Sequence, residues 1–282
     1  MPLILVPTPL GNLRDMTLRG LDALRECDLI VAEDTRVARK LLGALALPGK
    51  EIWSYREQNA AGATAGILER ARTQNVVVTT DAGMPGISDP GTELVAAARR
   101  DGVAVDVLPG ASAALGVAVL SGFDLRRFVF EGFPPRASGA RRDALRAAFG
   151  SGATTLWYES PQRILATLRD LTAVAPEARV FLVREYTKLH EQQILGTAAE
   201  VAAALPDPIR GEIAFAVAPQ EPAPAPAPAG VDVAIDRLLA EGAPVAEIAR
   251  SLAERGLGER RDLYARAVER KHAQRESVGA KR

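Results

Sequence analysis

The residues best suited to hold a ligand lie in one thirteen-residue stretch, Thr79-Thr-Asp-Ala-Gly-Met-Pro-Gly-Ile-Ser-Asp-Pro-Gly91. Gly83 and Gly86 let the backbone pass close to a ligand, because they carry no Cβ. Asp81 and Ser88 are able to hydrogen-bond a ligand or to cap backbone amides. A plain turn between strand and helix would account for two glycines. It accounts less well for the paired Gly/Pro pattern with two aspartates, which favours a binding loop.

Two further turns are expected at the same edge of a sheet. One, Val6–Asn12, follows the first apolar run, and the other, Leu108–Ser112, follows a later run, with Ser112 suited to cap a helix. None of the three turns matches Gly-x-Gly-x-x-Gly, and none carries the lysine of a P-loop. The turns therefore indicate a ligand-binding α/β protein and disfavour a dinucleotide or a nucleoside triphosphate.

The elements that position these turns alternate along the chain. Alternating apolar runs and amphipathic stretches are typical of α/β proteins with largely parallel sheets, which bind ligands at the carboxyl ends of the strands. The predicted strands are 3–6, 28–32, 76–79, 104–108, 127–130, 154–158, 179–183 and 212–218. The predicted helices are 18–25, 35–45, 60–73, 91–100, 113–120, 141–149, 161–173 and 198–205.

The number of strands predicts two lobes. The strands after Gly122 either complete one sheet or begin a second, and we expect a second sheet. This interpretation divides the chain into an N-terminal α/β lobe, a C-terminal α/β lobe, an extended Pro-Ala linker and a small helical unit. Their predicted bounds are 1–121, 122–218, 219–230 and 231–282.

The helical unit contains three short helical patterns, 233–241, 245–255 and 260–271. Its apolar spacing and glycine turn resemble a helix-turn-helix that presents a helix to nucleic acid. Three helices that merely pack on one another would show the same pattern. The excess of basic residues after Arg260 suits phosphate contacts, and equally a solvated helix face.

Composition limits the kind of protein. The 35 basic residues balance 35 acidic ones, so no general positive coat for nucleic acid is present and any polyanion must meet a local patch. A single cysteine, Cys27, excludes an intrachain disulfide, and two histidines make a histidine-based metal centre improbable. No signal peptide and no apolar run of roughly 20 residues is visible. We expect a soluble cytoplasmic protein without metal or membrane association.

Seven segments, taken together and in order, resemble the tetrapyrrole methylase family over roughly residues 3 to 218. Each alone is a weak signal, and the order makes the resemblance specific. Threonine is usual in that family where Met84 stands, and histidine where Gln162 stands; Val37 and Tyr186 also depart from its pattern. The segments are Pro7–Leu13, Ala32–Arg36, Asp81–Gly91, Leu108–Ser112, Phe130–Phe133, Tyr158–Pro161 and Arg184–Lys188.

The resemblance implies two α/β lobes of the tetrapyrrole methylase type with S-adenosylmethionine, as methyl donor, in the cleft between them. Within the family the segments are most similar to bacterial enzymes that 2′-O-methylate a cytidine ribose in small-subunit (16S) ribosomal RNA. The substrate would be free RNA or the small subunit, and the enzyme a homodimer. The implied cofactor-binding residues are Pro7, Thr8, Gly11, Asp81, Ala82, Gly83, Pro85, Gly86, Ile87, Ser88, Gly110, Ala111, Ser112 and Tyr158.

The same resemblance suggests where the proton of the ribose hydroxyl goes. Methyl transfer to a hydroxyl needs alignment of the reactants and a group that accepts the proton or stabilises the oxyanion. Lys188 with a lowered pKa, or Glu185 as a carboxylate, is the preferred candidate, ahead of Glu33, Asp34 and Glu159. A structural ion pair of Lys188 with Glu185 is the alternative.

Cationic residues are expected to grip the RNA around this cleft. The stretch Arg136–Arg142 is predicted to be a mobile basic loop that contacts phosphates. A surface helix with solvated charges is the alternative interpretation. The full set of predicted substrate-binding residues is Asn12, Arg36, Arg136, Arg141, Arg142 and Arg184.

Two other functions are compatible with the sequence. The same scaffold acting on a tetrapyrrole precursor, or on a protein side chain, is the first. A DNA-binding regulator, with an α/β body that senses a small molecule and a terminal helix-turn-helix, belongs to another class of protein. Residues 158–161 and 184–188, and the appended helices, favour RNA as substrate.

Overall fold

A computed structural model describes residues 2–56, 58–220 and 228–279 of the chain. Contacts within it divide the chain into two compact units, Met1–Gln220 and Glu221–Arg282. Most of the predicted Pro-Ala linker, 221–227, lies outside the described residues. The last three residues of that predicted linker begin a helix instead, in agreement with the preference for proline in a first helical turn.

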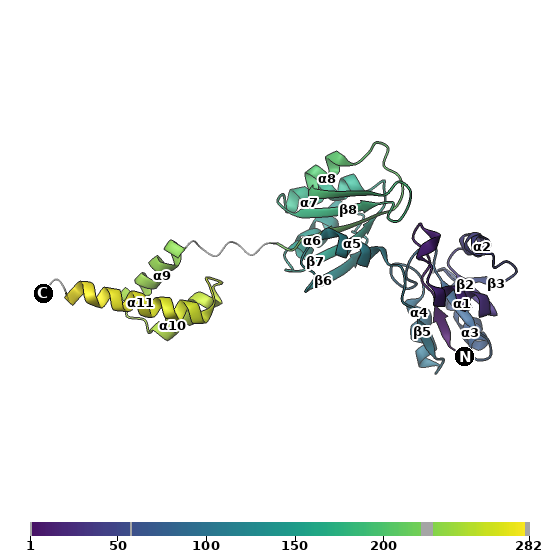
Figure 1. Cartoon of the computed structure of the whole chain (residues 1–282), viewed down its shortest axis with the longest axis horizontal. Coiled ribbons are helices and arrows are strands. Elements are labelled where there is room, and N and C mark those ends of the chain that lie inside the picture. The colour runs from purple at the N-terminus through teal and green to yellow at the C-terminus, as the bar shows by residue number, and fades with distance from the viewer. Residues whose placement is uncertain (1, 57, 221–227, 280–282) are drawn as a thin grey trace. The chain divides into compact units, whose positions relative to one another are not determined.

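The first sheet of the larger unit is wholly parallel; it lies in the purple-to-blue N-terminal part of the chain in Figure 1. Its strands run in the order β3-β2-β4-β1-β5, with bounds β1 Leu3–Leu5, β2 Leu29–Ala32, β3 Glu51–Ser54, β4 Val76–Thr79 and β5 Val105–Val107. In β4, Val76 and Val78 belong to one core cluster and Val77 to another. The central strands are therefore buried on both faces, as in other parallel sheets. Helices of this lobe are α1 Leu18–Glu26, α2 Thr35–Ala44, α3 Ala60–Ala71 and α4 Thr92–Arg100.

The second sheet is a separate five-stranded sheet, as expected, but it is not largely parallel. In the order β6-β7-β10-β8-β9 only β6 and β7 run parallel. A short connection joins β8 to β9, as is typical of an antiparallel pair. Strand β10 lies between β7 and β8 and runs antiparallel to both. The bounds are β6 Phe128–Gly132, β7 Thr154–Glu159, β8 Arg179–Arg184, β9 Gln192–Thr197 and β10 Ile213–Val217. The helices are α5 Ala113–Ser121, α6 Ser138–Phe149, α7 Ile164–Val174 and α8 Ala198–Ala204.

Helix α5 packs on the second sheet, although it precedes the predicted lobe boundary at residue 121. Its buried side chains, Ala114, Val117 and Ala118, share a core cluster with Leu156 and Phe181 of that sheet. Helix α5 therefore follows the last strand of the first sheet along the chain but packs on the second sheet. The lobe boundary itself stays a prediction.

The smaller unit is a helical unit with a core of its own. Its helices are α9 Pro228–Ala240, α10 Val245–Glu254 and α11 Arg260–Gly279. Ile248, Ala249 and Leu252 are buried, which confirms the apolar face predicted for the middle helix. Arg266 pairs with Asp232 at 2.6 Å, so part of the basic excess after Arg260 is neutralised within the unit. In the described residues, no helix is long and apolar enough to cross a membrane.

Candidate active site

Three predicted turns meet at the carboxyl edge of the first sheet. The amide of Thr8 donates to the carbonyl of Gly83 at 2.9 Å, and the amide of Gly83 returns a bond to Thr8 at 3.0 Å. The buried Thr8 hydroxyl also donates to the carbonyl of Thr80 at 3.1 Å. A Cβ on Gly110 would lie 2.7 Å from the Cβ of Pro7, so the third turn packs against the first without room for a side chain.

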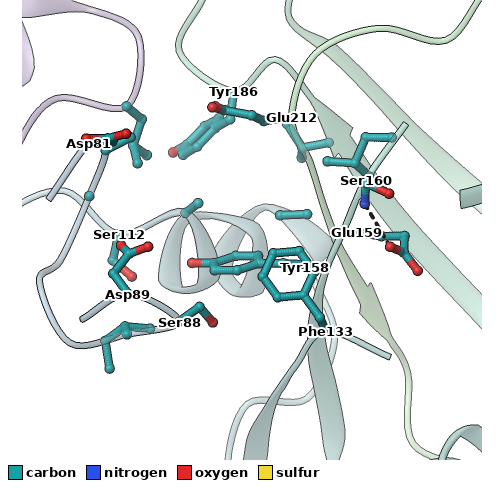
Figure 2. A pocket seen from close by; sticks show the side chains of 18 of the residues that line it. Asp81, Ser88, Asp89, Ser112, Phe133, Tyr158, Glu159, Ser160, Tyr186 and Glu212 are labelled. Carbon is teal, nitrogen blue, oxygen red and sulfur yellow. Dashed lines mark hydrogen bonds between the residues drawn. The ribbon is translucent and has the colours of Figure 1, made fainter. Parts of the chain in front are cut away.

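These turns border a cavity of about 450 Å³, which side chains of the second sheet close on the other side. Figure 2 shows Asp81, Ser88, Asp89 and Ser112 on one side of it and Tyr158 and Phe133 facing them. The volume is in the range of small-molecule sites. Of the predicted cofactor residues, those that line the cavity are Asp81, Ala82, Gly83, Ile87, Ser88, Ser112 and Tyr158. The others, Pro7, Thr8, Gly11, Pro85, Gly86, Gly110 and Ala111, do not line it.

Backbone conformation shapes the loop after β4. Gly83 and Gly86 both have φ of +85°, a region that side chains rarely adopt. Ser88 also has a positive φ, +63°, and its side chain reaches the cavity. The glycines thus serve the turn itself, and one of them, Gly83, also lines the cavity.

Acidic side chains give the cavity its charge. Glu33, Asp81 and Asp89 all line it. Burial, with the charges of Glu33 and Asp81, raises the pKa of Asp89 to about 6, and a hydrogen bond from Thr80 offsets part of the rise. Burial and the Glu33 charge likewise raise the pKa of Asp81. Because the carboxylates repel one another, the cavity suits a ligand that carries positive charge.

Two aromatic rings form the wall opposite these carboxylates. The hydroxyl of Tyr158 accepts a hydrogen bond from the amide of Ala114 at 3.1 Å, and burial raises the pKa of this tyrosine. The rings of Tyr158 and Phe133 meet edge to face, with centroids 5.8 Å apart. Hydrogen bonding at the start of α5 therefore fixes the ring that also supports Phe133.

Lys188 and Glu185, the predicted catalytic pair, form an ion pair beside the cavity and do not line it. Lys188 Nζ lies 2.9 Å from Glu185 Oε1 and 3.0 Å from Glu212 Oε2. Burial alone would lower the pKa of Lys188, but its bonds to the two carboxylates outweigh burial and raise it. For Glu185, burial raises the pKa, and the bonds from Lys188 and the Glu212 amide outweigh that effect and lower it. The sequence analysis predicted a lowered pKa for Lys188 as a base; the raised pKa contradicts that prediction.

The predicted mobile loop 136–142 is wrong. Helix α6 begins at Ser138, and Arg141 is buried, with its guanidinium 2.6 Å from the Asp170 carboxylate. A guanidinium in that position neutralises a buried carboxylate and is not free to reach phosphate. Arg142 is half-exposed and lies 3.7 Å from the Asp170 carboxylate. Arg136 is exposed, and its side chain makes no polar contact with the described residues.

The other predicted substrate contacts are dispersed. Arg36 bonds Asp34 at the start of α2, with Nε 3.0 Å from Oδ1. Arg184 donates to the carbonyl of Arg210 at 3.1 Å. Asn12 caps a short 3₁₀ helix, where its side chain accepts the Arg14 amide. None of these three lines the cavity.

Sequence reasoning missed several residues that line the cavity. Asp89 and Met84 lie in the stretch already singled out, and Phe133 and Tyr186 lie in segments that carry the family resemblance. No sequence motif marked Glu212, because it reaches the cavity only through the position of β10 in the second sheet. Within the described residues, no group of three or more His, Cys, Asp or Glu side chains is arranged to hold a metal ion.

Fold and site together define a two-lobed α/β protein with a small-molecule cavity at its strand ends. A family model for tetrapyrrole (corrin/porphyrin) methylases matches residues 2–202. The chain therefore belongs to this family of methyltransferases.

Within the family, the chain is similar to proteins named ribosomal RNA small subunit methyltransferase I. The Thermotoga maritima protein is 42% identical over 199 residues, 70% of this chain and 89% of its own length. The Synechocystis protein is 38% identical over 272 residues, 95% of this chain and 97% of its own length. Among solved structures, diphthine synthase shares the fold, with a TM-score of 0.62 and 17% identity over 77% of this chain and 90% of that chain.

Proposed function

We propose that the protein transfers a methyl group from S-adenosylmethionine to the 2′-hydroxyl of a cytidine ribose in 16S ribosomal RNA. The observation that carries the proposal is the acidic cavity between the lobes, supported by relatives named for small-subunit ribosomal RNA. S-adenosylmethionine supplies a sulfonium whose methyl carbon is open to displacement. Its positive charge matches the carboxylates of Glu33, Asp81 and Asp89.

The chain's own residues would place the reactants and receive the proton. The turns at Asp81–Ser88 and Ser112 hold the donor against Tyr158. As the new O–CH₃ bond forms and the S–CH₃ bond breaks, the hydroxyl proton passes to a carboxylate at the cavity wall. Asp89, a carboxylate that lines the cavity, is the group that we propose accepts it. In this proposal Lys188 and Glu185 act from beside the cavity, because the lysine holds Glu212 at its wall.

We further propose that the enzyme is a homodimer that works in the cytoplasm, where small subunits are made. Helix α5 is apolar on all sides, and the face turned away from the second sheet exposes Leu115, Val119 and Leu120. A second copy of the chain would cover this face. Sedimentation of wild type and Val119→Glu tests the dimer: the variant is expected to run as a monomer, and an unchanged dimer would contradict this interface.

Methyl transfer from labelled S-adenosylmethionine tests the reaction, with small subunits and free ribosomal RNA offered separately. We expect label in RNA at one linkage that resists alkaline cleavage, because a 2′-O-methyl group blocks attack on the phosphate. The form of RNA that is labelled faster identifies the substrate. Label in RNA without alkali resistance would contradict 2′-O-transfer.

A tetrapyrrole precursor is the second candidate, because the matching family model describes corrin and porphyrin methylases. Donor binding without RNA labelling, together with methylation of a tetrapyrrole, would support it. The comparisons give no support to a DNA-binding regulator.

A further inference from the structure

The loop between β6 and α6 presents an aromatic ring at the cavity. Phe133 lines the cavity, yet its side chain is 53% exposed. It is followed by Pro134 and Pro135, whose nitrogens carry no hydrogen, so the loop offers mainly carbonyl oxygens for hydrogen bonding.

Two arginines, buried Arg141 and half-buried Arg163, hold this loop by its carbonyls. Arg163 donates to the carbonyls of Pro134 and Pro135, and Arg141 donates to those of Pro135 and Arg136. Three consecutive carbonyl oxygens are therefore held from inside the lobe. Bonds of this kind, with a charged donor, are about twice as strong as neutral ones.

Each arginine is in turn neutralised by a carboxylate. Arg163 lies 3.2 Å from Glu159, and Arg141 lies 2.6 Å from Asp170. Glu159 also accepts the Thr167 hydroxyl at 2.7 Å, and Figure 2 shows its carboxylate turned away from the cavity. These carboxylates are thus committed to the loop rather than to a ligand.

The consequence is a rigid position for the Phe133 ring. A ring fixed before binding loses little conformational entropy when a partner stacks on it. The Phe133 and Tyr158 rings meet edge to face, so they do not cover each other as stacked rings would. More than half of the Phe133 surface remains exposed to solvent. Arg136, three residues along and exposed, adds a cation at the outer end of the same loop.

We propose that Phe133 is a stacking platform for a base of the RNA substrate, with Arg136 on a neighbouring phosphate. The proposal rests on the function proposed above and adds the part of the site that binds the acceptor. Single-stranded RNA is recognised by stacking of unpaired bases on aromatic side chains, combined with cationic contacts to the backbone. The adenine of the donor is the other group that could stack on this ring, and the test below distinguishes it from an RNA base.

The test compares Phe133→Leu and Phe133→Trp with the matched control Phe128→Leu. Phe128 begins β6, the strand that leads into the Phe133 loop; it is 43% exposed and does not line the cavity. For each variant, donor affinity is measured by calorimetry with S-adenosylmethionine, and kcat/KM is measured with the preferred RNA form. Thermal midpoints show that each variant is folded.

For Phe133→Leu we expect kcat/KM for RNA to fall by about fivefold to a hundredfold, the range of one lost base stack. Donor affinity should stay unchanged, and Phe133→Trp and Phe128→Leu should retain RNA activity. Arg136→Gln should reduce the salt dependence of RNA binding by about one phosphate contact.

Two results would overturn the platform. Unchanged kcat/KM for RNA in Phe133→Leu would show that no base stacks there, and a selective loss of donor affinity would assign the ring to adenine. If the wild-type enzyme binds the donor but labels no RNA, the proposed function fails first, and the two failures are thereby distinguished.

Discussion

At the scale of the residue, the cavity sets the protonation of Asp89. Its pKa of about 6 lies above the ordinary 3.8, because burial and two neighbouring carboxylates disfavour its charge. The folded protein thus binds this proton more tightly than the unfolded chain does. The three neighbouring carboxylates stabilise a bound cationic ligand, but without the ligand their repulsion lowers the free energy of unfolding.

The change Asp89→Asn should therefore stabilise the protein without donor. The contribution of Asp89, measured as the difference in free energy of unfolding between wild type and variant, should fall as pH rises from about 4 to about 6 and stay low above that. The variant should be more stable at about pH 8 by about 1–2 kcal/mol, after allowance for partial solvent exposure. Urea unfolding across this pH range measures it, with exposed Asp143→Asn as control. A difference between wild type and variant that stays constant over the same window would contradict the assignment.

Lys188 is not expected to act as the general base, because its raised pKa keeps the side chain charged. Lys188→Met should lower turnover by less than the hundredfold or more that typically follows loss of a general base, and the pH–rate profile should keep its shape. Turnover at saturating RNA measures this, with Lys188→Arg as the variant that keeps the charge. Loss of an ionisation from the profile, together with a fall beyond about a hundredfold, would restore the lysine as base.

At the scale of the element, α6 and α7 are joined by a buried ion pair. Arg141 of α6 meets Asp170 of α7, where the Ser138 hydroxyl also donates at 3.0 Å. A buried pair adds little net stability compared with apolar packing, but removal of one partner leaves an uncompensated charge. Within α6, Arg141 thus has a structural role, whereas Arg142 and Arg146 are more exposed.

Arg141→Met should lower the free energy of unfolding by about 3–5 kcal/mol. Arg142→Met is the matched control, since its side chain is 47% exposed and 3.7 Å from Asp170, and its effect should be small. Urea denaturation of both variants is the measurement. Equal, small effects would show that Arg141 is solvated and available to substrate after all.

At the scale of the whole molecule, the cavity and both sheets lie in one unit and the terminal helices form another. All residues that line the cavity precede residue 220, and Val231, Ile235 and Leu263 form the core of the helical unit. Each unit thus buries its own apolar surface. Donor binding should depend on the larger unit alone.

A chain ending at Gln220 should therefore bind S-adenosylmethionine with unchanged affinity, as measured by calorimetry. Its kcat/KM for RNA then reports what the helical unit adds to RNA binding. Loss of donor binding in the shortened but folded chain would contradict the independence of the two units.

The sequence by itself determined most elements and the binding turns. Apolar runs such as Val76–Val78 and the glycines at Gly83 and Gly86 carry local signals, because period, burial and positive φ restrict residue type. Strands β3 and β9 were missed because each is a sheet edge and only partly buried, so neither shows an apolar run.

Tertiary structure alone decided the role of each charged residue. Arg141 and Arg136 look alike in sequence, yet one neutralises buried Asp170 and the other is exposed. The pKa of Lys188 is raised by Glu185, its neighbour in sequence, and also by Glu212, which β10 brings to it. The physical reason is that charge interactions depend on distance and burial between segments far apart in the chain, whereas helices, strands and turns depend mainly on neighbours in sequence.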